Sequence, residues 1–284
     1  MVGGRVKKIG KTLPKELIDN SGKQLERLDT KPALLDLKNL ESKNIYYFGT
    51  VDSTNLIIRR LAAEGAPNFS TAVAEEQQEG RGRLGRSWFS PRGTGLWFSM
   101  LLRPDISNRI DITPVTLVTA AVLANYFREV HKLPVLVKWP NDLLLSGKKI
   151  GGTLTEIIGI PDRPGYLVTG IGLNINQQEI DFPGELRLRA TSLALESGNF
   201  YNRTELFLAI KETLEKAYRL FFSEGFPPFQ KLWKKHSSTL GQDVTLSWTG
   251  GTMRGKALDL SKHGELLLQD EQGKIHTVNY GELI

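Results

Sequence analysis

The segment best suited to chemistry is a loop rich in arginine and glycine, Gly80-Arg81-Gly82-Arg83-Leu84-Gly85-Arg86-Ser87-Trp88. No acidic residue occurs between Gly80 and Pro104. Guanidinium groups at this density repel one another unless an anion lies among them, and phosphate matches their planar geometry. Glycine lets the backbone approach a ligand closely. We expect a triphosphate to be surrounded by Arg81, Arg83, Arg86 and Arg92, with a solvated basic turn or an RNA-binding segment as alternatives.

A second cluster follows, Lys138-Trp139-Pro140-Asn141-Asp142-Leu143 and then Lys148-Lys149-Ile150-Gly151-Gly152. Asp142 is able to hold Mg²⁺ or to accept a proton, although Asn-Asp is also common turn chemistry. The compact charge of Lys149 can bridge a carboxylate and an α-phosphate, unless the side chain simply reaches solvent. Two adjacent glycines in a strand favour close approach of a ligand. Together the clusters predict a nucleotide-handling site.

Smaller polar groups stand at the ends of other expected elements. Ser53, Thr54 and Asn55 begin a helix, where one of them is expected to cap it and the hydroxyls can also reach a small polar ligand. Gln77 ends a strand just before the Arg/Gly loop. Asn174 either contacts a nucleotide or ends the strand that begins Gly170-Ile171-Gly172, whose glycine spacing does not fit a dinucleotide fingerprint.

Composition excludes several classes of protein. The 284 residues carry 37 Lys and Arg against 31 Asp and Glu, a net charge of +6 that permits acidic partners without requiring them. The absence of cysteine excludes a disulfide scaffold, thiolate catalysis and cysteine-ligated metals. The four histidines lack ligand spacing. No apolar run reaches the roughly 18 residues of a spanning helix, so we expect a cytoplasmic protein.

The hydrophobic pattern predicts an α+β fold. Strands are expected at 45–51, 72–74, 95–102, 135–138, 149–158 and 166–175, the last three forming a meander. Helices are expected at 55–64, after an N-cap at Thr113, and at 204–224. Four short strands after His236, at 244–248, 253–259, 266–269 and 274–278, predict a small β-barrel. The predicted domains are an N-terminal extension at 1–43, a catalytic domain at 44–237 and a C-terminal barrel at 238–284.

These motifs carry a resemblance to a known family. Asp52-Ser53-Thr54-Asn55, Gly80–Trp88, Lys138–Leu143 with Lys149–Gly152, and Gly170–Asn174 stand in the order seen in biotin protein ligases. The resemblance covers residues 45–284. It implies a mixed β-sheet flanked by helices, similar to class II aminoacyl-tRNA synthetases and lipoate ligases, plus an SH3-like C-terminal barrel. It also implies synthesis of biotinyl-adenylate from biotin and Mg·ATP, followed by transfer of biotin to one lysine of a biotin carboxyl carrier domain.

The resemblance also implies residue roles. The catalytic residues are Lys149, Arg83 and Asp142. The biotin contacts are Ser53, Thr54, Asn55, Gln77, Gly80, Arg81, Gly82, Lys149 and Gly152. The ATP and adenylate contacts are Arg83, Arg86, Trp88, Asn141, Asp142 and Asn174, and Asp142 is the candidate Mg²⁺ ligand. We expect the Arg/Gly loop to be mobile until ligand binds.

Some alternatives remain open at this point. Repressors of the same family carry a winged helix-turn-helix of roughly 55–65 residues, and the polar segment 1–43 is shorter, so DNA binding is not expected, although a truncated DNA-binding region remains an alternative. A homodimer is compatible with the resemblance. The other candidate functions are lipoate or octanoate ligation on the same fold, a transcriptional regulator that senses biotinyl-adenylate, and an RNA-binding module.

Overall fold

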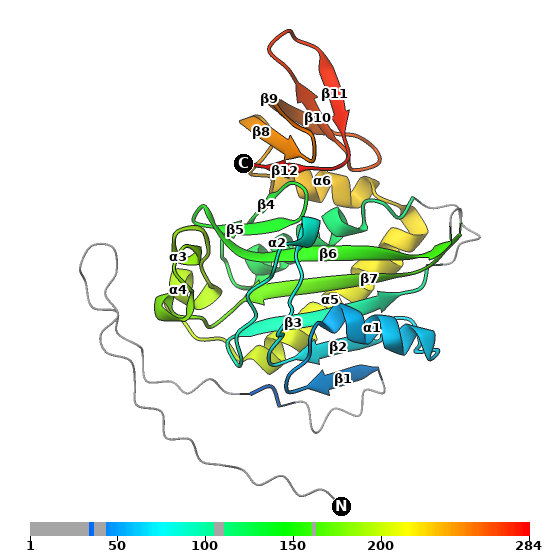
Figure 1. Cartoon of the computed structure of the whole chain (residues 1–284), viewed down its shortest axis with the longest axis vertical. Helices are drawn as coiled ribbons and strands as arrows, with labels where there is room; N and C mark the ends of the chain where they lie inside the picture. The colour runs from blue at the N-terminus through cyan, green and yellow to red at the C-terminus, as the bar shows by residue number, and fades with distance from the viewer. Residues whose placement is uncertain (1–33, 37–43, 105–110, 161–162) are drawn as a thin grey trace, which may run out of the picture.

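A seven-stranded mixed β-sheet forms the centre of the molecule, in the order β1-β2-β3-β7-β6-β5-β4 (Figure 1). The computed structural model describes residues 34–36, 44–104, 111–160 and 163–284, so nearly all of the expected N-terminal extension at 1–43 lies outside the described residues. The strands are β1 (Ile45–Phe48), β2 (Thr71–Ala74), β3 (Gly95–Leu102), β4 (Leu136–Lys138), β5 (Asp142–Leu145), β6 (Lys148–Ile160) and β7 (Arg163–Asn174). Only β1 and β2 pair in parallel.

Helices cover both faces of this sheet. They are α1 (Thr54–Ala63), α2 (Val115–Val130), α3 (Leu186–Arg189), α4 (Leu193–Ser197), α5 (Arg203–Glu224) and α6 (Pro227–Lys235). Alternate residues of a strand point to opposite faces. Accordingly, Ala72 packs with α1, whereas the adjacent Val73 packs into the larger core with α2, α5 and α6.

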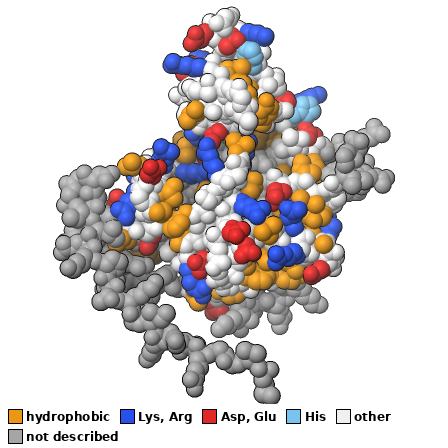
Figure 2. All heavy atoms as spheres, viewed as in Figure 1, with side chains coloured by type: hydrophobic (Ala, Val, Ile, Leu, Met, Phe, Trp, Pro, Cys, Tyr) orange, Lys and Arg blue, Asp and Glu red, His pale blue; other side chains and the backbone are white. Residues whose placement is uncertain are grey.

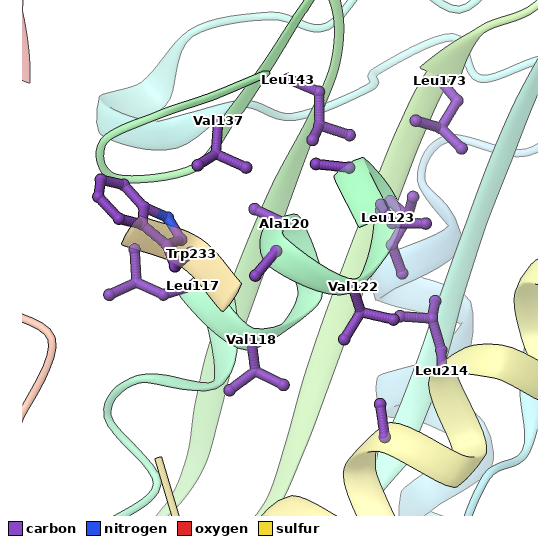
Figure 3. Close-up of a cluster of buried hydrophobic side chains, with 14 of the residues drawn as sticks. Leu117, Val118, Ala120, Val122, Leu123, Val137, Leu143, Leu173, Leu214 and Trp233 are labelled. Carbon is purple, nitrogen blue, oxygen red and sulfur yellow. The ribbon is translucent and has the colours of Figure 1, made fainter. Parts of the chain in front are cut away.

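Helix α2 is buried as its composition predicts (Figure 3). Its side chains lie between the sheet and helices α5 and α6. Figure 3 shows Leu117 and Leu123 in this layer with Leu214 and Trp233 around them. The expected N-cap at Thr113 is wrong, because α2 starts at Val115 and Pro114 occupies the N-cap position. The Thr113 backbone N–H instead donates to Asp111 Oδ1 at 2.9 Å, in the preceding turn.

The C-terminal residues form a five-stranded antiparallel sheet in the order β11-β10-β9-β8-β12. Its strands are β8 (Asp243–Trp248), β9 (Gly251–Leu260), β10 (Leu266–Gln269), β11 (Ile275–Val278) and β12 (Glu282–Leu283). This domain rests on α6, where Gln230 Nε2 donates to the carbonyl of Leu260 and Lys234 pairs with Asp259 at 2.7 Å. The predicted α+β architecture with a C-terminal β domain is confirmed, while β5, α3, α4, α6 and β12 were not predicted.

Candidate active site

A cleft opens between the Arg/Gly loop (residues 80–88), the adjoining ends of β5 and β6, and β12 of the C-terminal domain. Basic side chains lie just below the C-terminal domain on the face shown in Figure 2. The predicted site residues on the cleft wall are Ser53, Thr54, Asn55, Gln77, Arg81, Gly82, Arg83, Arg86, Trp88, Asn141, Asp142, Lys149 and Gly152. Segments about 100 residues apart in the sequence, from Ser53 to Gly152, thus meet at one place, and residues 282–283 join them.

The Arg/Gly loop is closed by its own backbone. Gly82 N–H donates to the Arg86 carbonyl and Trp88 N–H donates to the Gly80 carbonyl, both at 2.7 Å. A Cβ on Gly80 would lie 2.4 Å from the Trp88 carbonyl oxygen, so the two limbs of the loop meet only because this residue is glycine. Gly80 itself is buried and does not line the cleft. At the tip, Leu84 takes a φ of 54°, which is rare for a branched side chain.

The arginines of the loop find one acidic partner inside the chain. Arg86 Nη1 pairs with Glu282, and Arg83 Nη1 donates to the Gly281 carbonyl at 3.3 Å. Besides the triphosphate that the loop is expected to bind, the C-terminal domain therefore supplies a carboxylate to these arginines. Burial lowers the pKa of Arg83 from its ordinary value, and the charges of Asp142 and Glu282 oppose this. Arg92 is directed elsewhere, since it donates to the Gly49 carbonyl at 3.2 Å and does not line the cleft.

Lys149 lines the cleft and contacts two of the other predicted site residues. Its Nζ lies 2.7 Å from Asp142 Oδ1 and 5.1 Å from the centre of the Trp88 ring, a cation–π distance. The Trp88 ring rests on glycine, because a Cβ on Gly172 would lie 2.4 Å from its Nε1. Gly152 also faces this group, because a Cβ at this position would lie 3.5 Å from Asp142 Oδ1. These glycines leave the space in which Lys149 and Trp88 meet.

Hydrogen-bonded polar side chains form the opposite wall of the cleft. Gln77 Oε1 accepts from the backbone N–H of Thr54 at 2.9 Å, and its Nε2 donates to Ser90 Oγ at 2.9 Å. The expectation that a hydroxyl caps α1 is wrong, because Ser53 occupies the N-cap position without a side-chain cap bond and Thr54 Oγ1 contacts Gln77 instead. Among the described residues, Ser53 Oγ has no hydrogen-bond partner, so it is available to a ligand.

Two predicted contacts, Asn174 and Asn141, and the neighbouring Trp139 have partners within the protein. Asn174 is buried outside the cleft, where its Nδ2 donates to the Thr191 carbonyl at 3.0 Å and its Oδ1 accepts from Gln177. Asn141 lines the cleft, but its Nδ2 donates to the Thr153 carbonyl at 2.8 Å. Trp139 is a core residue whose Nε1 donates to the Gly264 carbonyl at 3.3 Å.

Sequence reasoning missed several polar groups at or near the cleft. They are Ser90, Ser99, Glu156 and Glu282. Ser99 interrupts the apolar run of β3, and a hydroxyl in such a run signals a buried polar contact. Glu282 stands near the end of the chain without any motif around it.

The described residues of the cleft offer few side-chain ligands for a metal ion. Among the described residues, no three His, Cys, Asp or Glu side chains gather in a way that could hold one. Asp142, the predicted Mg²⁺ ligand, already pairs with Lys149. Because Mg²⁺ is often held by one or two carboxylates together with substrate phosphates, Asp142 fits an ion that arrives with a triphosphate, and no dedicated metal centre is implied.

Comparison with known proteins identifies the family. The model of the biotin/lipoate A/B protein ligase family matches residues 47–174, and that of the biotin protein ligase C terminal domain matches residues 239–284. A bifunctional ligase/repressor BirA from Bacillus subtilis is 38% identical over 81% of this chain and 71% of that protein. The chain belongs to the biotin protein ligase family. A BirA from Escherichia coli is 31% identical over 83% of this chain and 72% of its own length.

The fold of this ligase agrees with solved structures. Biotin protein ligase from Aquifex aeolicus, in complex with biotin and ATP, superposes with a TM-score of 0.73 at 33% identity, covering 85% of this chain and 98% of the other. In the described part of the ligase, no helix has the length and apolarity needed to cross a bilayer.

Proposed function

We propose that this ligase activates biotin with ATP and then transfers it to a lysine of an acceptor protein. The observation that carries the proposal is the single cleft that unites a polar wall at Thr54 and Gln77 with the Lys149–Asp142 pair and with the arginines of the loop. A small polar acid and a triphosphate need these two kinds of surface side by side. The Aquifex aeolicus relative, of closely similar fold, holds biotin and ATP together.

In the first step, a carboxylate oxygen of biotin forms a bond to the α-phosphorus of ATP. The bond from that phosphorus to the oxygen bridging to the β-phosphate breaks, and pyrophosphate leaves with the electron pair. Two anions must approach each other, and the ammonium of Lys149 offsets their repulsion where charge develops. The guanidinium groups of Arg83 and Arg86 bind the polyphosphate. Asp142 is the residue that would hold a Mg²⁺ ion arriving with the triphosphate, and such an ion would offset negative charge on the polyphosphate.

Between the steps, the mixed anhydride must be kept from water. Trp88 packs over Gly172 beside Lys149, which places an aromatic surface against the reactive end of the ligand. Arg83, half-buried and held to the Gly281 carbonyl, covers the other side. These two side chains retain biotinyl-adenylate until an acceptor arrives.

In the second step, the acceptor lysine attacks the carbonyl carbon of the anhydride and AMP leaves. The attacking amine of the acceptor lysine loses a proton. Asp142, which pairs with Lys149 on the cleft wall, is the carboxylate that receives this proton. Relatives from Paracoccus denitrificans and Mycobacterium tuberculosis are named biotin–[acetyl-CoA-carboxylase] ligases, which supports a biotin carboxyl carrier domain as the acceptor.

Lipoate or octanoate ligation is the second candidate. The polar wall argues against it, because a dithiolane ring or an alkyl chain offers no hydrogen bond to Thr54 and Gln77, whereas the ureido ring of biotin does. Repression of transcription rests only on the names of the BirA relatives, and the segment that would bind DNA lies in residues 1–33 and 37–43, outside the described residues.

The transfer reaction tests the whole proposal. The ligase is incubated with biotin, Mg·ATP and a purified biotin carboxyl carrier domain, and the acceptor is weighed by mass spectrometry. We expect the mass of one biotinyl group to be added, and none on an acceptor whose target lysine is arginine. An acceptor modified by lipoate but not by biotin would replace the proposal with the second candidate.

A further inference from the structure

A chain of hydrogen bonds extends from the polar wall of the cleft to a residue outside it. Thr54 Oγ1 lies 2.7 Å from Ser99 Oγ, and Ser99 Oγ donates to Asn55 Oδ1 at 2.6 Å. Asn55 Nδ2 then donates to Glu156 Oε2 at 2.7 Å. Ser99 is fully buried, and Glu156 belongs to β6 but does not line the cleft. The chain therefore ends on a carboxylate that a bound ligand does not touch.

This carboxylate sets the direction of the bonds. An ionised carboxylate only accepts, so the NH₂ group of Asn55 must face Glu156 and its carbonyl oxygen must face Ser99. The hydroxyl of Ser99 has one proton, which goes to Asn55. Ser99 has then no proton left for Thr54, so the Thr54 hydroxyl donates to Ser99 Oγ at 2.7 Å or to Gln77 Oε1 at 3.0 Å, and Gln77 Oε1 also accepts from the Thr54 backbone N–H. Reversing the Asn55 amide would reverse the Ser99 hydroxyl, which would then donate to Thr54, and would leave the backbone N–H as it is.

The side-chain amide of Asn55 also packs against a glycine. A Cβ on Gly170 of β7 would lie 2.3 Å from Asn55 Oδ1 and 3.3 Å from its Nδ2, so the amide packs directly on the strand backbone. Packing fixes where the Asn55 side chain lies but does not distinguish its oxygen from its nitrogen, which have nearly the same shape. Only the hydrogen-bond partners make that distinction, and Glu156 is the one that cannot donate.

We propose that Glu156 is a positioning residue that keeps the Asn55 carbonyl oxygen toward Ser99, so that the Thr54 hydroxyl donates into the protein and offers its oxygen as an acceptor to an N–H group of the substrate ring. The inference rests on the proposed biotin ligation, because it assigns the ureido ring to this wall. A ring with an N–H donor adds a hydrogen bond to the Thr54 oxygen, and a ring without one loses that bond. Glu156 thereby acts on specificity for the acid and not on the adenylation chemistry.

A series of substitutions at Glu156 tests this, with steady-state kinetics of adenylation as the measurement. Glu156→Gln keeps an acceptor, Glu156→Met keeps the length without one, and Glu156→Lys offers a donor that turns the Asn55 amide around. We expect the KM for biotin to rise in that order, little for Gln and about tenfold or more for Lys, with the KM for ATP and kcat little changed. A merely structural role would change all three parameters together.

The matched control is Arg59→Met. Arg59 Nη1 lies 3.8 Å from Glu156 Oε1 on the exposed side, so this variant removes the neighbouring charge and keeps the Asn55–Glu156 bond. It is expected to behave as the parent. An equal rise in the KM for biotin in Arg59→Met and Glu156→Met would mean that the Arg59–Glu156 ion pair matters and the hydrogen bond to the Asn55 amide does not. That result overturns the proposal.

A change in the ligand gives a second test that does not depend on how well the variants fold. A biotin analogue with CH₂ in place of a ring N–H is compared with biotin in each protein. In the parent we expect about tenfold discrimination against the analogue, and in Glu156→Lys a much smaller ratio. An unchanged ratio contradicts the role of Glu156. If the parent protein forms no biotinyl-adenylate, the proposed function itself is wrong. That result differs from an unchanged ratio, which contradicts only the role of Glu156.

Discussion

Lys149 Nζ and Asp142 Oδ1 form a 2.7 Å ion pair on the cleft wall, with the Trp88 ring 5.1 Å from the same ammonium. The pair lines the same cleft as the polar wall at Thr54 and the arginines of the loop, within which the proposed reaction brings a carboxylate and an α-phosphate together. The two roles proposed for these side chains follow from that position.

Lys149→Ala is expected to slow adenylate formation by about 10²–10³-fold, because it removes the positive charge where the two anions meet. Biotin binding should weaken far less, since the ring end of the ligand is held by the opposite wall. Single-turnover formation of biotinyl-adenylate and calorimetric binding of biotin separate the two effects. Lys148→Ala, which alters the exposed neighbour, is the control. Adenylate formation at the parent rate in Lys149→Ala would show that the assigned role is wrong.

Arg83→Gly is expected to release biotinyl-adenylate into solution. Arg83 is anchored to the Gly281 carbonyl at 3.3 Å and lines the cleft, so its removal opens a path for the intermediate to leave and for water to enter. The free intermediate is measured by rapid filtration and mass spectrometry. Arg92→Ala, an arginine directed toward Gly49 and away from the cleft, should retain adenylate as the parent does. Retention in both variants would argue against a covering role for Arg83.

The sequence motifs point to residues that the structure brings to one cleft, because their glycines, arginines and lysines are closely spaced; the functional roles of these residues stay predictions. β3 was predicted at 95–102 and is found there, since an eight-residue apolar run between turn residues has one interpretation. β5 was missed because Asp142–Leu145 is short and begins within the motif that was assigned to binding. α6 was missed because Pro227 and Pro228 read as a loop, although proline is favoured in the first turn of a helix.

Contacts between distant segments could not be predicted from the chain alone. Nothing around Glu282 indicates that it meets Arg86, nearly 200 residues earlier. Likewise, Gly170 and Gly172 were seen as alternate glycines of a strand, but their neighbours Asn55 and Trp88 come from other elements. These features depend on how the sheet and the C-terminal domain pack, which local patterns do not record.

A buried ion pair ties the edge of the sheet to α5. Arg203 Nη2 lies 2.8 Å from Glu75 Oε2, and Glu75 Oε1 also accepts from Tyr47 Oη and from the backbone N–H of Leu35. Burial and the Glu75 carboxylate raise the pKa of Tyr47 to about 12, so this phenol stays protonated.

Glu75→Ala is expected to lower the free energy of unfolding by about 3–5 kcal/mol, because the buried guanidinium loses its carboxylate. Urea denaturation measures the change. The comparison variant is Glu212→Ala, which breaks an exposed pair with Lys216 on α5 and should leave the free energy of unfolding nearly unchanged. Similar small losses in both variants would show that the buried pair adds no stability.

His236 is expected to make the protein less stable in mild acid. Burial lowers its pKa below the ordinary value near 6.5, and the charges of Arg128 and Lys235 lower it further. Between the lowered pKa and about 6.5, the unfolded chain binds a proton that the folded chain does not, so stability is present above this window and is lost as pH falls through it.

The measurement is the melting temperature at about pH 7.5 and about pH 5.5, in the parent and in His236→Gln. Glutamine does not titrate and can still reach Asn125, the present partner of the ring at 3.2 Å. We expect a smaller acid-induced drop in the variant. His263→Gln, a change at an exposed histidine that pairs with Asp111 instead, should not reduce the drop. An equal drop in parent and His236→Gln would remove His236 as its cause.

Release of pyrophosphate is the measurement that tests the central claim most directly. The purified protein is given Mg·ATP with biotin, with lipoate or with no acid, and the ligand that it retains is identified by mass spectrometry. The account predicts release that depends on biotin, with biotinyl-adenylate bound in the cleft. No release with biotin, or release that depends on lipoate instead, would contradict it.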